Sequence, residues 1–179
     1  MDQAEITQLL GVENGELTAE QELAMEQVYQ HLRTIAHGQR LKVSGNRIDT
    51  TALVNEAWLK SQRAKNGFND RDHFFAYCAL AMRHILFDQA RRNRLITYVD
   101  DDSALDRMPV YQQSETMLEL ERQLEKLREF EPRLEQVFTC KFFGDMPFDA
   151  IARVLGLSER TVFRDWQKAR TMLAVAMGE

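Results

Sequence analysis

Residues 147–173 read PFDAIARVLGLSERTVFRDWQKARTML, and this stretch decides the class of fold. Apolar residues recur at helical spacing on both sides of Gly156, which stands where a turn needs a positive φ angle. Ser158 is a good N-cap for the second helix, because its hydroxyl accepts a hydrogen bond from a free backbone N–H. The stretch therefore predicts two short helices, at about 148–155 and 158–174, joined by a tight turn.

The second of these helices is predicted to have one buried face and one basic face. Four apolar residues repeat at helical spacing and predict the buried face: Val162, Trp166, Ala169 and Leu173. The outward positions hold Arg160, Phe163, Arg164, Gln167 and Lys168. Arginine suits guanine edges and phosphates, and glutamine suits adenine edges. We therefore predict a helix-turn-helix whose second helix lies in the major groove of DNA. The alternative is a helical hairpin with a solvated charged face.

The rest of the chain also has a helical composition. Its 179 residues are 44% hydrophobic and include only 8 Gly and 3 Pro, so an all-α protein with a buried core is expected. Apolar spacing predicts further helices at about 20–37, 51–65, 73–92, 114–129 and 132–143. Residues 95–114 lose that spacing and combine an acidic run with Pro and polar residues, which predicts a flexible linker. We expect two small helical domains, 1–94 and 115–179, joined by this linker.

Charge is unevenly distributed along the chain. The net charge is −5, yet residues 83–94 contain four Arg and one Asp, and residues 160–170 contain three Arg, one Lys and one Asp. Basic helices on an acidic background are typical of a protein that touches DNA at defined places and another protein elsewhere.

Several classes of protein are excluded by the pattern. Cys78 and Cys140 lie in apolar surroundings, which predicts core residues in a reducing compartment rather than a disulfide framework. The N-terminus has no apolar signal region and no stretch approaches 18 apolar residues, so we expect a cytoplasmic protein with no membrane partner. The spacing of His73, Cys78 and His84 does not match a zinc site. With no nucleophile–base pair or phosphate loop, we expect neither an enzyme nor a cofactor or metal.

Three motifs in order resemble one family, sigma factors of the extracytoplasmic-function (ECF) type within the sigma-70 family. Residues 147–173 resemble the C-terminal promoter-binding domain. TALVNEAWLKSQRA at 51–64 is similar to the helix that docks on the clamp of RNA polymerase. HFFAYCALAMRHILFDQARRNR at 73–94 is similar to the helix that melts and reads the −10 element. The resemblance implies a sigma factor whose partners are core RNA polymerase and promoter DNA.

The resemblance also implies roles for particular residues. The five outward residues of the last helix would read the −35 element. Two sets of residues would contact the −10 element. The polar groups that capture a flipped base would be Asn66, Asn69 and Asp70. The arginines that hold phosphates or the opened strand would be Arg83, Arg91, Arg92 and Arg94. Polymerase docking would involve Asp49, Leu53, Asn55, Glu56 and Trp58. For the arginines, the alternative is a basic helix end that complements its own dipole.

One departure from the family suggests regulation. The docking helix of the family usually begins with an acidic cluster, Asp-x-Glu-Asp, but here Asp49 is followed by Thr51 and Ala52 at the other two acidic positions. We hypothesise that a Ser/Thr protein kinase phosphorylates Thr51 and restores the missing negative charge. Thr50 is the adjacent alternative, and either residue could instead be only an N-cap.

Two other functions compete with a sigma factor. One is a stand-alone helix-turn-helix regulator with an N-terminal protein-interaction domain, and the other is a helical adaptor that has lost DNA binding. The second basic helix at 83–94 favours the sigma factor, because a simple repressor does not need it. The sequence leaves open whether the two domains pack together in the free protein.

Overall fold

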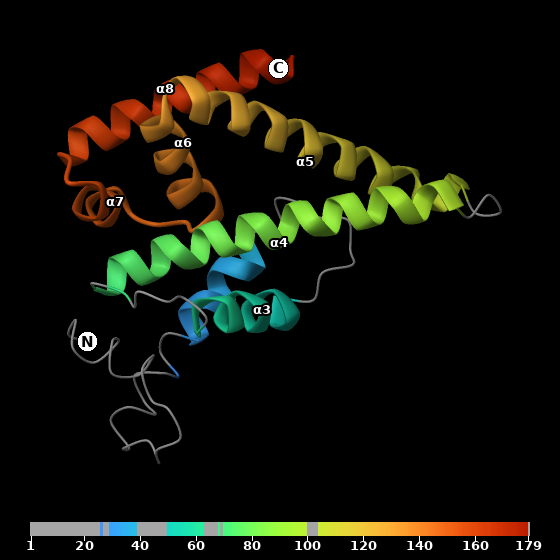
Figure 1. Cartoon of the computed structure of the whole chain (residues 1–179), viewed down its shortest axis with the longest axis horizontal. Coiled ribbons are helices and arrows are strands. Elements are labelled where there is room, and N and C mark those ends of the chain that lie inside the picture. Colours follow the sequence, from blue (N-terminus) through green and yellow to red (C-terminus); the bar gives the residue numbers. More distant parts are fainter. Residues whose placement is uncertain are drawn as a thin grey trace.

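The structure is a computed structural model and describes residues 26, 29–38, 50–62, 68, 70–99 and 104–178. Within these ranges every regular element is a helix, so the predicted all-α class is confirmed there. A helical segment at 29–38 precedes α3 (Thr50–Gln62), α4 (Arg71–Val99), α5 (Ala104–Phe130), α6 (Pro132–Phe138), the π-helical turn η2 (Thr139–Phe143), α7 (Phe148–Leu155) and α8 (Glu159–Met177) (Figure 1). None of the described helices is long and apolar enough to cross a membrane.

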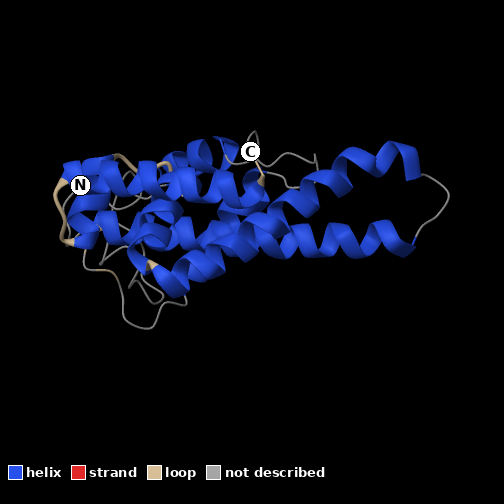
Figure 2. Ribbon diagram, turned by 90° about the horizontal axis from the view of Figure 1, so that it is seen from above, coloured by secondary structure: helices blue, strands red, loops and turns tan. Residues whose placement is uncertain are grey.

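The longest helices, α4 and α5, differ most from the prediction. They lie side by side and project together beyond the other elements (Figure 2). Residues 95–99 end α4 and residues 104–114 begin α5, where we expected an irregular linker. The prediction relied on apolar spacing, and Leu95, the first residue of the expected linker, is well exposed although it lies within α4. The boundaries of the two domains stay a prediction.

One continuous core joins the described elements. Phe74, Leu32 and Val54 are fully buried where α4 packs against α3 and the helical segment 29–38. On the other side of α4, the rings of Phe87 and Phe143 make an edge contact with centroids 5.7 Å apart. Figure 1 shows α4 between α3 and the group formed by α5–α8. The core therefore has no break between the N-terminal and C-terminal helices.

The turn after η2 packs tightly against α4 at Gly144. A Cβ atom at Gly144 would lie 2.7 Å from the Ala79 Cβ and 2.7 Å from the Cys140 carbonyl oxygen. Only glycine fits there without movement of its neighbours. The predicted helix over 132–143 is divided: Pro132 starts α6 in its first turn, as expected, and the chain then widens into the π-helical turn η2, which packs against α4.

Candidate nucleic-acid interface

The turn between α7 and α8 has the predicted geometry. Gly156 ends α7 in the left-handed region, with φ of 64° and ψ of 36°. The Leu157 N–H then donates a hydrogen bond to the Ala152 carbonyl oxygen (2.9 Å). This bond gives a partner to one of the carbonyl groups at the C-terminal end of α7. At the start of α8 the Thr161 N–H donates to Ser158 Oγ (3.2 Å). Both the predicted positive φ and the predicted N-cap are confirmed, and together they fix the angle at which α8 leaves α7.

The buried face of α8 contains one charged residue that the sequence analysis missed. Val162, Ala169 and Leu173 are buried as predicted, and Trp166 is half-buried. Asp165 is also buried, at 4% exposure. Its carboxylate accepts hydrogen bonds from Arg133 Nε (2.7 Å) and a terminal guanidinium nitrogen of the same arginine (3.3 Å). Helical spacing in the sequence could have predicted that Asp165 is buried, because residue 165 lies three residues after one core position and four before another.

The outward residues of α8 form an exposed row: Arg160, Phe163, Arg164, Gln167 and Lys168. Phe163 is 49% exposed, and its ring meets the Phe148 ring of α7 edge-on with centroids 5.4 Å apart. Lys168 Nζ donates to the Glu131 carboxylate at the α5–α6 junction (2.9 Å). The row therefore presents two arginines, an amide and an aromatic ring on one helix, with one lysine held by an acid.

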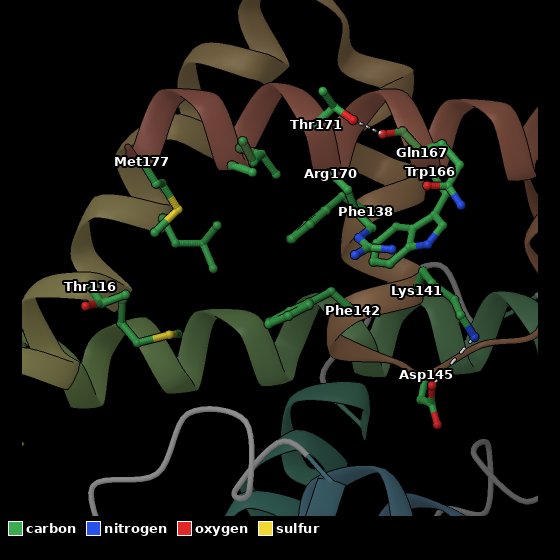
Figure 3. Close-up of a pocket in the computed structure, with 14 residues that line it drawn as sticks. Thr116, Phe138, Lys141, Phe142, Asp145, Trp166, Gln167, Arg170, Thr171 and Met177 are labelled. Atoms are coloured by element: carbon green, nitrogen blue, oxygen red, sulfur yellow. Dashed lines mark hydrogen bonds and ion pairs between the residues drawn. The ribbon is translucent and has the colours of Figure 1, made fainter. Parts of the chain in front are cut away.

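Arg170 belongs to another side of α8. Its guanidinium lies over the Trp166 ring, 5.6 Å from the centroid. Both residues line a cavity of about 640 Å³ between α5, η2 and α8, together with Phe138 and Phe142 (Figure 3). Gln167 of the exposed row also lines this cavity, so the cavity borders the row, and Arg170 lies beside it.

The four arginines of α4 have different surroundings. Arg83 is only 4% exposed; its guanidinium forms an ion pair with Glu135 and donates to Thr139 Oγ1 (3.0 Å). The expectation that Arg83 is presented to DNA is therefore not met in this structure, because α6 covers it. Arg91 pairs with Asp88 and Glu121, and Arg94 Nε lies 3.0 Å from Glu115 Oε1. Arg92 is exposed.

The residues predicted to capture a flipped base are only partly described. Asn66 and Asn69 lie outside the described residues. Asp70 immediately precedes α4, and its carboxylate accepts a hydrogen bond from the His73 N–H (2.8 Å), which makes it a cap of that helix. Burial raises the pKa of Asp70, but the hydrogen bonds and charge of His73 outweigh it and leave the pKa below its usual value. Asp70 is therefore held as a carboxylate.

The predicted docking residues of α3 divide between core and surface. Asp49 lies outside the described residues. Leu53 is 1% exposed and belongs to the core, which corrects its assignment to a docking surface: it packs inside rather than facing a partner. Asn55 and Glu56 are exposed, and Trp58 is half-buried with its ring 6.1 Å from that of Phe74.

Two further residues extend the exposed side of α3. Leu59 is a large exposed side chain that the sequence analysis overlooked; it lies three and four residues after exposed positions, so helical spacing could have found it. Thr51 is exposed in the first turn of α3, and that turn contains no acidic residue. The described surface of this helix is therefore weakly charged.

Both cysteines are buried core residues, as predicted. Burial raises the pKa of the Cys140 thiol to about 12 and that of Cys78 further still. Neither thiol is a reactive thiolate near neutral pH. Among the described side chains, no group of three His, Cys, Asp or Glu residues is arranged to hold a metal ion.

Helices make up every regular element of the described ranges, and two basic helices with a capped α7–turn–α8 unit fit a transcription factor that contacts DNA. The family model for the ECF sigma factor matches residues 3–179, so the chain belongs to the ECF sigma factor family. It is an alternative sigma factor that directs transcription, with core RNA polymerase and promoter DNA as its partners. No curated protein and no solved structure matches the chain.

Proposed function

We propose that this sigma factor reads promoters with two separate surfaces, of which α7 and α8 supply the −35 reader. In this proposal α7 and α8 are a helix-turn-helix, and α8 enters the major groove with its exposed row against base edges and phosphates. The observation that carries the proposal is the alignment of Arg160, Arg164 and Gln167 on one exposed side of a helix whose start is set by Gly156 and Ser158.

The N-terminal helices would dock on polymerase and engage the −10 element. The exposed Asn55 and Glu56 of α3 support a role as a docking surface, as do the half-buried Trp58 and exposed Leu59. On α4, Arg92 is exposed and supports contact with a phosphate or the opened strand. Residues 1–94 and 115–179 would act as two functional domains, and 95–114 as the connection between them.

Run-off transcription with core polymerase tests the −35 assignment. Arg164→Ala should lower transcription from the native promoter and relax preference at one −35 base pair, because a good base contact discriminates by about 1–3 kcal/mol. Arg128→Ala removes an exposed arginine at the end of α5 and is the matched control. An equal loss for both variants would contradict base reading by α8. A stand-alone regulator would instead bind the duplex as tightly without polymerase as with it.

Phosphorylation of Thr51 is a second part of the proposal. Its exposed position and the absence of an acid in the first turn of α3 support it, since a phosphate there would add charge at a helix N-terminus. A Ser/Thr protein kinase would be the activating partner. Polymerase pull-down should recover Thr51→Glu and the phosphorylated wild type, but not Thr51→Ala. Equal recovery of Thr51→Ala and wild type from cells with an active kinase would end the proposal.

A further inference from the structure

Phe163 is the apolar member of the exposed row of α8, and its ring stays 49% exposed. We propose that Phe163 is a specificity-determining residue that reads one thymine of the −35 element through the 5-methyl group of that base, and that Phe148 of α7 positions its ring. This inference rests on the proposed −35 reading by α8. It goes beyond that function because it names a base that the promoter must contain and the atoms by which that base is recognised.

The chemistry of the Phe163 side chain selects its partner on the DNA. A phenyl ring has no hydrogen-bond donor for a phosphate oxygen and no polar group for the polar atoms of a base edge. In the major groove, thymine presents an apolar group, its 5-methyl, which adenine, guanine and cytosine lack. Contact between this methyl and the exposed part of the ring removes apolar surface of both partners from water. The favoured partner of Phe163 is therefore a thymine.

The Phe163 ring is held in place by α7 before DNA binds. It meets the Phe148 ring edge-on, with centroids 5.4 Å apart and ring planes at 88°. Phe148 is the first residue of α7 and packs against the core. Lys141 Nζ lies over the Phe148 ring, 5.2 Å from its centroid, and donates a hydrogen bond to the Met146 carbonyl oxygen (3.0 Å). A side chain that is ordered in advance loses little conformational entropy on binding.

The neighbours of Phe163 in the row confine the thymine to a short segment of DNA. Arg160 and Gln167 stand seven residues apart, which is about 10 Å along a helix and corresponds to about three steps of ~3.4 Å along a DNA strand. Arginine suits guanine edges and glutamine suits adenine edges. The thymine should therefore lie in the same short run of base pairs as a guanine and an adenine.

Two other roles of Phe163 make different predictions. A ring that only covers Phe148 would contribute to stability, and its loss would leave the preference among bases unchanged. A ring that wedges between base pairs would stack on them, and stacking is tolerant of sequence because every base has a π-face. The dependence of binding on a single methyl group therefore distinguishes thymine reading from both of these roles.

The main test removes that methyl from the DNA. Holoenzyme, formed from the full chain and core RNA polymerase, first selects its −35 duplex from a random library. Each thymine of the selected element is then replaced in turn by deoxyuridine, which keeps the hydrogen-bonding groups of thymine and lacks the methyl. At one thymine the wild type should bind about fourfold more weakly, the factor expected for one methyl-sized apolar group. Unchanged affinity at every −35 thymine would overturn the proposal, and because the protein is unaltered, misfolding could not explain that result.

Protein variants assign the methyl contact to Phe163. Phe163→Ala should bind the thymine and deoxyuridine duplexes equally, and Phe148→Leu should reduce the difference because the ring loses its support. Met172→Ala is the matched control and should keep the full difference, since Met172 is a 42% exposed apolar residue of α8 outside the row. A full difference retained in Phe163→Ala would overturn the role of Phe163. A full difference retained in Phe148→Leu would overturn the positioning role of Phe148.

The outcomes separate this inference from the function on which it rests. A wild type that selects a −35 element and loses a guanine preference in Arg164→Ala, but ignores the methyl at every thymine, would refute the thymine contact and leave the −35 reading by α8 standing. A wild type that selects no −35 element, or one whose preferences are unchanged in Arg164→Ala and Phe163→Ala alike, would refute the −35 reading by α8 and the thymine contact with it.

Discussion

The two basic helices of this protein, α4 and α8, both carry a cluster of arginines, but the surroundings of those arginines differ. On α8 the arginines at 160 and 164 are exposed, and the residues that set the helix in place are its immediate neighbours in sequence. On α4, Arg83 is buried, and its partner Glu135 is 52 residues away. The comparison teaches that local spacing decides where an arginine points along a helix, whereas tertiary packing decides whether it is available to DNA.

The largest expected effect concerns the buried arginine. Arg83→Ala should lower the free energy of unfolding by about 3–5 kcal/mol, because it leaves the Glu135 carboxylate buried without its partner. Urea denaturation followed by circular dichroism measures this loss. Arg83→Met/Glu135→Leu removes both charges, keeps apolar volume and should cost much less. A loss below about 1 kcal/mol for Arg83→Ala would mean that water reaches the Arg83–Glu135 pair. The arginines of α4 and α8 would then be alike in their exposure to solvent.

The α7–α8 unit could be predicted in detail because its determinants are local. Gly156, Ser158 and the repeat of Val162, Ala169 and Leu173 all act within a few residues of one another. The same spacing rule, applied more strictly, would have found Asp165 and Leu59 as well. The rule failed at residues 95–114, because their sequence combines an acidic run with Pro and polar residues and has no apolar repeat, although 95–99 and 104–114 are helical.

The surroundings of α4 could not be predicted, for a different physical reason. Charge counting identified the arginine cluster, but it does not reveal which acid lies opposite. Glu135 looks like an ordinary first-turn acid of α6 until η2 and Gly144 bring that helix against α4. Leu53 was misassigned for the same reason: the sequence of α3 is apolar on more than one side, and only the packing of α4 decides which side is buried.

An intermediate effect is expected at the turn of the α7–α8 unit. Gly156→Ala should destabilise the protein by about 1–2 kcal/mol, because a Cβ is strained in the left-handed region even though nothing lies within 4 Å of it. Thermal denaturation measures the loss, and −35 binding should fall with it as the angle of α8 relaxes. Gly178→Ala has a similar φ at the end of α8 and should only fray the last turn. Equal losses of stability for Gly156→Ala and Gly178→Ala would show that the cost comes from the strained backbone alone and not from the position of Gly156 in the turn.

The smallest expected effect concerns Glu131, an acid that pairs with Lys168 of the exposed row. Glu131→Gln should release Lys168 and raise holoenzyme affinity for a −35 duplex by no more than about threefold, because exposed ion pairs are weak and screened by salt. Electrophoretic mobility shift at low salt measures the gain. Glu129→Gln removes an exposed acid two residues earlier and is the control. The same gain from both variants would indicate a general effect of net charge.

The pair of Glu131 and Lys168 should also make the stability of the protein depend on pH. The hydrogen bond from Lys168, followed by its charge, lowers the pKa of Glu131. A carboxyl with a lowered pKa contributes stability that is fully present above its unfolded value of about 4.3 and is lost as the pH falls through the lower, folded value. The effect of Glu131→Gln on melting temperature should therefore be constant from pH 6 to pH 8 and should vanish in acid, as wild type becomes neutral at this position too. A difference that persisted unchanged below the folded pKa would mean that Glu131 acts through packing, and the exposed row of α8 would then depend on tertiary contacts as the arginines of α4 do.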